Sequence, residues 1–478
     1  MAMESKPLRI LISPNYGNSY DQRMAKGLAA GFHSIGHYAH SLEAPISSIE
    51  IAKICGCLSI DVVIEVNRAR DPDVALPPNV RHISWFQDVF PETLEGFADG
   101  FRDCDILYAL GDAKVLGLNV QVPCYVGSLV TGVDQTVINY DKNPVSGYVE
   151  FSLCGFIPPP FITTPSIRQD LLWYLDNIIA RSPLLCGSKL VWILRRVLFR
   201  RQLPVDYVPY AALVALKDIV DGLYRPLRGE LDIHELTTSM EDIIAIFVGA
   251  SVTSGSFKSR YKPKNAASRF SMLLKPYASR HVDYDDMKGA FSKYITYDDT
   301  RALLGESRAF SKAINYLAQT YPRLLDRQEL VSKILQISGS LELYGPGWNT
   351  HHEFRNYHKG FIESQTALLD VYRRSYINLA NNTHGLGLHS RTLECMAVGG
   401  FIFTHTSPHD GKPGGMLTSF EPEVHYGAFT PENIQEEARR WLKDEKKRKE
   451  VGRRAAAVIR GQHCWHHRAQ QIVNDLRK

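Results

Sequence analysis

The sequence lacks the cysteine pattern of a zinc site and the cysteine density of a secreted disulfide scaffold. Its 478 residues include eight cysteines, none in a paired C-x-x-C spacing, so we expect reduced, buried thiols. An excess of one charge is also absent, because 55 Lys and Arg stand against 51 Asp and Glu, for a net charge of +4. This balance gives little support for a nucleic-acid or other polyanionic partner.

Long hydrophobic runs are missing as well. The run IIAIFVGA near residue 243 is far too short to span a bilayer, and the amino end shows no signal-peptide core. Apolar residues make up 44% and charged residues 22% of the chain, close to the globular average. We therefore expect a cytoplasmic protein, long enough for two or three domains.

Apolar runs alternate with polar loops and helical stretches in the first part of the chain. Such alternation is typical of a doubly wound parallel sheet with helices on both faces. Residues 1–149 are predicted to form this first Rossmann-like domain. The predicted strands are residues 8–13, 59–67, 81–88, 105–110 and 123–128.

A second alternating series follows residue 335 and predicts a second Rossmann-like domain at 335–458. The strand-like residues 150–156 are predicted to be its first strand, so the mostly helical residues 157–334 form an insertion in this domain. The predicted strands are 341–345, 359–362, 376–381 and 401–406, with helices at 365–375 and 390–398. Two charged helices are predicted at 431–461 and 463–476.

One helix of the insertion has an amphipathic pattern. In KLVWILRRVLFRR, residues 189–201, a basic stripe lies opposite an apolar one. An ordinary helix packed on its own domain is the favoured interpretation. The alternative is peripheral contact with the inner face of a membrane.

The stretch THGLGLHSRTLECMAVGGFIFTH, residues 383–405, carries the main candidate site. We expect Ser390 to cap a helix that ends at Gly399, with the N–H groups near Leu388 to Arg391 facing an anion. Arg391 and Glu394 share one helical face, which suits phosphate and ribose hydroxyls. The alternative is a surface ion pair worth under about 1 kcal/mol.

A dinucleotide cofactor is disfavoured at this turn. Ser390 stands where a third glycine would follow Gly385 and Gly387, and the strand at 401–406 ends without an acidic residue for the ribose. We therefore expect no bound cofactor.

Several motifs resemble the nucleotide-binding half of GT-B fold glycosyltransferases, most closely the CgeB-like group. They are LELYGPGWN, HKGFIES, LLDVYRRSYINLANN, SRTLECMAVGGFIFTH and HCWHHRA, within residues 335–470. The resemblance implies two Rossmann-like domains facing across a cleft, with a nucleotide sugar as donor substrate on the second. It also implies a metal-independent reaction, and a last helix, residues 459–478, that crosses back to the first domain.

The resemblance also implies roles for single residues. Glu394 would contact the ribose, Arg391 and the turn at 387–390 the diphosphate, and Lys359 a further phosphate. Gly345 and Gly347 would allow a close approach of the backbone to the donor. Trp348 would be a wall of the site or a platform on which the base stacks. The donor-site residues are Gly345, Gly347, Trp348, Lys359, Gly387, His389, Ser390, Arg391 and Glu394. Leu386 stands where family 4 enzymes have a second glutamate, which argues against their retaining mechanism.

Asp88, after the strand at 81–88, is the predicted general base for an inverting transfer. The alternative is a turn aspartate before Pro91, and Asp21 and Tyr16 are weaker candidates for the base. His384 is expected near the sugar or the leaving phosphate, or else merely hydrogen-bonded. The predicted activity is glycosyl transfer to a glycan, protein or lipid-linked acceptor. The rival is a catalytically silent GT-B-like binding or assembly protein.

Overall fold

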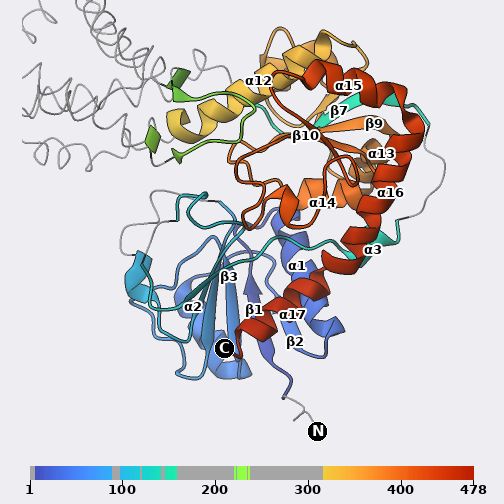
Figure 1. Ribbon diagram of the computed structural model, residues 1–478. Helices are drawn as coiled ribbons and strands as arrows, with labels where there is room; N and C mark the ends of the chain where they lie inside the picture. The colour runs from blue at the N-terminus through green and yellow to red at the C-terminus, as the bar shows by residue number, and fades with distance from the viewer. Residues whose placement is uncertain are drawn as a thin grey trace, which may run out of the picture. The chain divides into compact units, whose positions relative to one another are not determined.

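The structure, a computed structural model, contains two parallel sheets (Figure 1). It describes residues 6–88, 97–118, 121–140, 146–158, 220–221, 223–233, 235–236 and 316–478. Both sheets belong to one compact unit, formed by Met1–Ile157, Pro226–Glu230 and Asp326–Lys478. A second unit comprises Pro158–Arg225 and Leu231–Leu325. The predicted α/β class with two Rossmann-like sheets is confirmed.

The first sheet has the strand order β2-β1-β3-β4-β5-β6. Strands β3 and β5 are buried throughout, as expected of parallel strands covered on both faces. The strands are β1 (Arg9–Ser13), β2 (Tyr38–Ser41), β3 (Val62–Val66), β4 (Arg81–Phe86), β5 (Ile106–Ala109) and β6 (Tyr125–Ser128). The helices are α1 (Ser19–Ser34), α2 (Ser48–Leu58), the short η2 (Phe97–Gly100) and α3 (Gln135–Ile138).

The second sheet has the order β11-β10-β9-β7-β8. The strand predicted at 150–156 is β7, and it lies between β9 and β8. The strands are β7 (Val149–Cys154), β8 (Leu341–Tyr344), β9 (Ser375–Ala380), β10 (Ile402–His405) and β11 (Gly427–Phe429). The long helices are α12 (Tyr321–Leu335), α13 (Gln365–Arg374), α14 (Ser390–Ala397), α15 (Ile434–Lys443), α16 (Glu445–Gln462) and α17 (Trp465–Asp475). Shorter helical turns are η5 (Tyr316–Thr320), η6 (Trp348–Thr350), η7 (Arg355–Tyr357) and η8 (Met416–Thr418).

Three predictions of local structure are wrong. Residues 359–362 form no strand, because Gly360 has a φ of 95° and Phe361 is 71% exposed. The helix predicted at 431–461 is split into α15 and α16 at Asp444, whose side chain accepts a hydrogen bond from the N–H of Lys447 and so caps α16. The cysteines of the described residues are free, but Cys57 and Cys104 are exposed instead of buried.

No helix in the described part of the chain is both long and apolar enough to cross a bilayer. The predicted helical character of most of residues 157–334, the amphipathic helix at 189–201 and Cys186 lie outside the described residues.

The chain crosses between the sheets at two places, and these crossings are hydrogen-bonded to each other. Val133, after β6, donates its N–H to the carbonyl of His463, and Trp465 donates its N–H to the carbonyl of Val133. The buried guanidinium of Arg468 adds donations to the carbonyl of Thr131 at 3.1 Å and to Nδ1 of His463 at 2.6 Å. These bonds join the linker after β6 to the turn between α16 and α17.

Helix α17 packs on α1 of the first sheet (Figure 1). Trp465 sits over two glycines of α1, Gly27 and Gly31, which lie one turn apart. A Cβ on Gly31 would lie 2.5 Å from the carbonyl oxygen of Trp465, and one on Gly27 would lie 2.2 Å from its Nε1. Glycine weakens a helix interior, so its presence here is explained by this close approach.

We expect Gly31→Ala to lower the free energy of unfolding by about 1–3 kcal/mol, because the new methyl group meets backbone that cannot rotate away. Urea denaturation would measure the change. The control is Gly56→Ala in α2, where no atom lies within 4 Å of the added carbon. The control should gain about 0.5–1 kcal/mol from helix propensity alone. Equal effects of the two substitutions would contradict the packing argument.

Candidate functional site

A small cavity of about 30 Å³ lies at the carboxyl ends of β7 and β9, with room for about one water molecule. In the order β11-β10-β9-β7-β8, the chain leaves β7 toward β8 and returns to β9 on the other side. Ligands of open α/β sheets bind at such a switch point, beyond the carboxyl ends of the strands. Its polar lining residues are Ser152, Arg327, Tyr372, Asn378, Asn381, His389, Arg391 and Thr392.

Two arginines make this cavity positive. Arg391 donates from Nη1 to the carbonyl of Cys154 at 2.9 Å, and the guanidinium of Arg327 lies 4.8 Å from the ring of Phe156. Both reach Gly155, since a Cβ there would lie 2.5 Å from Nη1 of Arg391 and 3.3 Å from Nη2 of Arg327. No carboxylate is among the described residues that line the cavity. The surroundings therefore favour an anion.

The sequence pattern predicted Arg391 but missed Arg327. Arg327 is only 4% exposed and lies in α12, at the end of the predicted insertion 157–334. A single buried arginine in a helix far along the chain from β7 leaves no periodic signal in the sequence. Its position becomes informative only once the structure shows that residues from Asp326 onward belong to the same compact unit as β7.

The amino end of α14 lies beside this positive cavity. None of the described residues accepts a hydrogen bond from the N–H groups of Ser390, Arg391 and Thr392. These groups and the helix dipole together suit an anion. The N–H groups without an acceptor in the described part of the chain therefore begin at Ser390, two residues after the predicted Leu388. The N–H of Leu388 is bonded to the carbonyl of Gly414, and that of His389 to the carbonyl of Gly387.

The prediction that Ser390 caps α14 is wrong. His389 occupies the cap position and its side chain makes no capping bond, while Ser390 is the first helical residue. The hydroxyl of Ser390 instead accepts a hydrogen bond from the hydroxyl of Tyr20 at 3.0 Å. Since Tyr20 lies in α1, this bond joins the site to the first sheet.

Glu394 lies one turn along α14 and is 7% exposed. Its Oε1 is 3.5 Å from Nη2 of Arg23 in α1 and 3.1 Å from Nε2 of Gln365 at the start of α13. Burial raises the pKa of Glu394, and the charge of Arg23 offsets part of the rise. The alternative of a surface ion pair with Arg391 is therefore wrong. Neither Arg23 nor Gln365 was predicted as a site residue.

Among the described residues, Glu394 accepts both of its hydrogen bonds at Oε1. Within the part of the chain that the structure describes, no hydrogen bond reaches the other oxygen, Oε2. A carboxylate oxygen that is still able to accept, on a mostly buried side chain, suits a ligand that brings hydroxyl groups.

The glycines of the β8 loop are explained by contacts within the chain. Gly345 and Gly347 have φ of 115° and 96°, and a Cβ on Gly347 would lie 2.0 Å from the carbonyl oxygen of Ile157. Trp348 is fully buried and donates from Nε1 to the carbonyl of Gly155 at 2.7 Å. It therefore lies in the wall behind the cavity, and its ring offers no open face to a base.

The other predicted donor residues lie around the loops that end β8 and β9. Lys359 is exposed, and its N–H is bonded to the carbonyl of Leu343. Gly387 packs against Met416, since a Cβ would lie 2.5 Å from its Cγ. His384 is half-buried, and its N–H bonds to Oδ1 of Asn382. His389 lines the cavity itself.

Carboxylates gather at the matching edge of the first sheet. Asn67, after β3, accepts from the N–H of Asp88 at 3.2 Å and so holds the turn after β4, with the side chain of Asp88 exposed. Asp21 is buried and accepts from the N–H of Tyr16 at 3.1 Å. Burial raises the pKa of Asp21, and the charge of Asp88 adds to the rise. The two carboxylates are thus neighbours.

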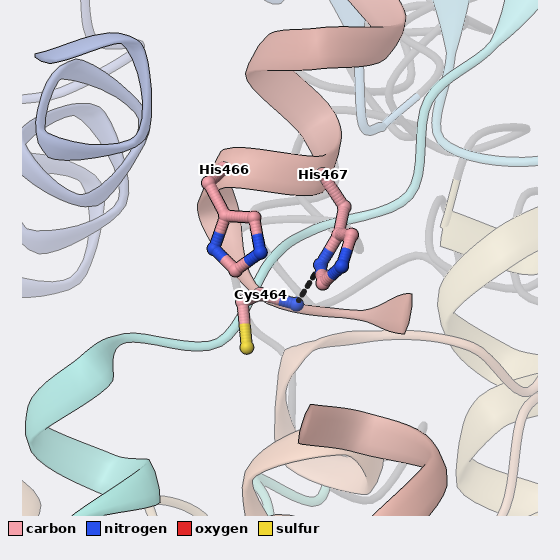
Figure 2. A group of neighbouring side chains, drawn as sticks. All are labelled: Cys464, His466 and His467. Carbon is pink, nitrogen blue, oxygen red and sulfur yellow. Dashed lines mark hydrogen bonds between the residues drawn. The ribbon is translucent and has the colours of Figure 1, made fainter. Parts of the chain in front are cut away.

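Among the described residues, one group offers ligands for a metal ion: Cys464, His466 and His467, with ligand atoms within 4.8 Å of one another. Figure 2 shows the sulfur of Cys464 pointing away from both imidazole rings. Nδ1 of His467 accepts from the N–H of Cys464 at 3.2 Å, and the thiol lies 3.7 Å from the carbonyl oxygen of Ile459. These contacts hold the residues at the start of α17. Burial raises the pKa of the Cys464 thiol. We assign no metal to this group.

A protein-family model described as "Glycosyl transferase-like" matches residues 326–474, which include Arg327, Arg391 and Glu394. A solved glycosyltransferase from Rickettsia africae ESF-5 is 9% identical, with 99% of this chain and 98% of that chain covered and a TM-score of 0.43. Anabaena Alr3699/HepE in complex with UDP and glucose is 10% identical, with 98% and 99% covered and a TM-score of 0.42. Likenesses this low are no basis for assigning a function. Comparison with curated proteins finds no match.

The raised pKa of Glu394 predicts a pH dependence of stability. The folded state binds the proton more tightly than the unfolded state, so this carboxyl group stabilises the fold below the ordinary glutamate pKa of about 4.3. That stabilisation is lost as the pH rises through the folded pKa. Relative to Glu394→Gln, which cannot titrate, the free energy of unfolding of the wild-type chain should therefore fall as the pH rises from about 4.3 through the folded pKa of Glu394.

Urea denaturation of both proteins between pH 4 and pH 7 would measure this difference. Glu50→Gln in α2 is the control of opposite sign, because hydrogen bonds from Ser47 lower the pKa of Glu50. A wild-type stability that rises with pH relative to Glu394→Gln would contradict the assigned burial.

Proposed function

We propose that the chain is a glycosyltransferase that moves a sugar from a nucleotide-sugar donor to a hydroxyl group of an acceptor. The observation that carries the proposal is the buried carboxylate of Glu394, one turn from a helix amino end whose N–H groups have no acceptor among the described residues. The match of residues 326–474 to a glycosyl transferase-like family supports it. The motif resemblance favours the CgeB-like group of GT-B enzymes.

The donor diphosphate would lie at the amino end of α14. Arg391 and Arg327 supply two positive charges there, and the N–H groups of Ser390, Arg391 and Thr392 supply donors. Negative charge grows on the departing diphosphate as the glycosidic bond breaks, so donors held in place stabilise the transition state most. Because the chain itself supplies positive charge, the proposed reaction needs no metal ion.

The ribose would lie against Glu394. Its two hydroxyl groups can donate to the carboxylate, and the first contact would be with Oε2. The diphosphate and the ribose then occupy successive turns of one helix, which matches the order of the groups in a nucleotide. Lys359 is proposed as a further phosphate contact.

The acceptor hydroxyl would lose its proton to Asp88. The exposed side chain of Asp88 lies after β4, and its charge adds to the rise that burial causes in the pKa of Asp21. His384 is proposed near the sugar or the leaving phosphate. In this arrangement residues 1–149 present the acceptor, while residues 150–156 and 335–458 hold the donor together with Arg327 of α12. Residues 157–334 form the insertion, and residues 459–478 return to the first domain.

A nucleoside diphosphate should stabilise the wild-type chain against heat. At 100 times its dissociation constant it adds about 2.7 kcal/mol to the free energy of unfolding. In a thermal-shift panel of UDP, GDP, ADP and CDP, we expect one to act on the wild type and on the control Glu436→Ala, an exposed residue of α15. Glu394→Ala should abolish the shift because the ribose contact is lost.

Arg391→Ala separates the phosphate contact from the ribose contact. This variant should weaken the diphosphate by about tenfold or more, as expected for a charge-assisted hydrogen bond, and leave the affinity for the bare nucleoside unchanged. Glu394→Ala should weaken both ligands. Normal diphosphate affinity in Glu394→Ala would remove the proposed site.

Asp88→Asn tests the proposed base against the rival, a silent binding or assembly protein. We expect sugar transfer to fall by about a hundredfold or more, the usual share of a general base, with the dissociation constant of the diphosphate unchanged. Donor turnover is measured as release of nucleoside diphosphate. Asp73→Asn, an exposed aspartate beyond β3, is the control. An unchanged rate removes Asp88 from the mechanism, and no turnover in the wild type favours the silent protein.

A further inference from the structure

The insertion sends one short segment back to the sheets. Residues Pro226–Glu230 belong to the compact unit that holds both sheets, whereas Pro158–Arg225 and Leu231–Leu325 on either side belong to the other unit. We name Pro226–Glu230 the return segment. Nothing in the sequence pattern distinguishes it from the rest of the insertion.

The return segment is anchored on the carboxyl edge of the second sheet. Leu227 is fully buried with a φ of 62°, and its N–H donates to Oδ1 of Asp326 at 2.8 Å. Asp326 is itself fully buried, and its Oδ2 is 3.4 Å from Nδ2 of Asn381, at the end of β9. One buried carboxylate therefore joins the return segment to the strand that ends at the cavity.

A second anchor holds the loop that leads into α14. Ser407, after β10, donates from Oγ to the carbonyl of Gly229 at 3.1 Å. Gly229 and Gly385 are packed backbone to backbone, because a Cβ on Gly229 would lie 2.7 Å from Cα of Gly385. In the reverse direction, a Cβ on Gly385 would lie 2.4 Å from the carbonyl oxygen of Gly229.

These contacts reach the proposed donor site through very little chain. Only four residues separate Gly385 from Ser390, the first residue of α14. Within that stretch, the N–H of Leu388 is bonded to Gly414 and Gly387 packs on Met416. A shift of Gly385 must therefore be absorbed by a short loop that is already fixed at its other end. That loop leads directly into the amino end of α14.

We propose that the return segment positions the 382–388 loop for binding of the donor diphosphate, so that the insertion controls donor affinity. The inference rests on the proposed function of α14 as the diphosphate site. The return segment acts through the loop and touches no proposed ligand contact itself. It is a positioning element, and Gly229 is its critical residue.

Gly229→Ala is the direct test, since the added methyl group would push against Cα of Gly385. The matched control is Gly147→Ala. Gly147 has a φ of 73°, similar to the 62° of Gly229, but no atom lies within 4 Å of the added carbon. Both variants introduce the same backbone strain, and only the first pushes on the loop. Titration calorimetry with whichever of UDP, GDP, ADP and CDP stabilises the wild type should show binding about tenfold or more weaker in Gly229→Ala than in Gly147→Ala.

Hydrogen exchange of residues 382–388 gives a second readout that needs no ligand. We expect faster exchange in Gly229→Ala and wild-type exchange in Gly147→Ala. If Gly229→Ala does not fold, Ser407→Ala is the second variant, because it removes the hydrogen bond to Gly229 without backbone strain. It should weaken binding of the nucleoside diphosphate by about threefold, as expected for one lost hydrogen bond.

The outcomes separate this inference from the proposed function. If the wild-type chain binds none of UDP, GDP, ADP and CDP, the proposed donor is wrong, and the exchange rates alone decide the role of the return segment. Wild-type affinity together with wild-type exchange in Gly229→Ala would overturn the inference. The inference would also be overturned if Gly147→Ala weakened nucleotide binding as much as Gly229→Ala does, because backbone strain alone would then explain the effect.

Discussion

The buried guanidinium of Arg468 is the contact on which the pairing of the two sheets depends. Among the described residues no carboxylate pairs with it, and its partners are two carbonyl oxygens and a histidine nitrogen. Burial lowers the pKa of Arg468 to about 10, so the group stays charged at neutral pH. Burial also lowers the pKa of His463 to about 3, which keeps that ring neutral and able to accept. A cation held by neutral acceptors joins both crossings of the chain without a salt bridge.

The contacts between α1 and α14 depend on that junction. Arg23 and Tyr20 reach across to Glu394 and Ser390 only because α1 is held against α17, and α17 against the linker. Glu394 is consequently buried between elements of both sheets. Its carboxylate keeps a raised pKa although Arg23 and Arg391 both favour the charged form, so loss of water outweighs two positive neighbours.

The sequence predicts the inner strands well because parallel strands covered on both faces are mostly apolar, as in β5, whose residues ILYA form an unbroken apolar run. The edge strands β2 and β11 were not predicted, since YAHS and GAF carry no such run. For the candidate site, the spacing of Arg391 and Glu394 points to α14 from the sequence alone. The partners Arg23, Gln365 and Arg327 come from three other helices, and only the tertiary fold brings them together. Ser390 resembles a cap in sequence, but Tyr20 takes its hydroxyl.

The place where the insertion joins the second sheet has an evolutionary consequence. The chain departs just after β7 and rejoins at α12, so both junctions lie on the edge that carries Gly155 and Arg327. Sequence added at this point leaves the strand order and register untouched, because β7 and β8 pair directly. The strand pairing of the core is therefore independent of how much chain lies between the two junctions. A lineage could lengthen or shorten that chain while inheriting the same scaffold.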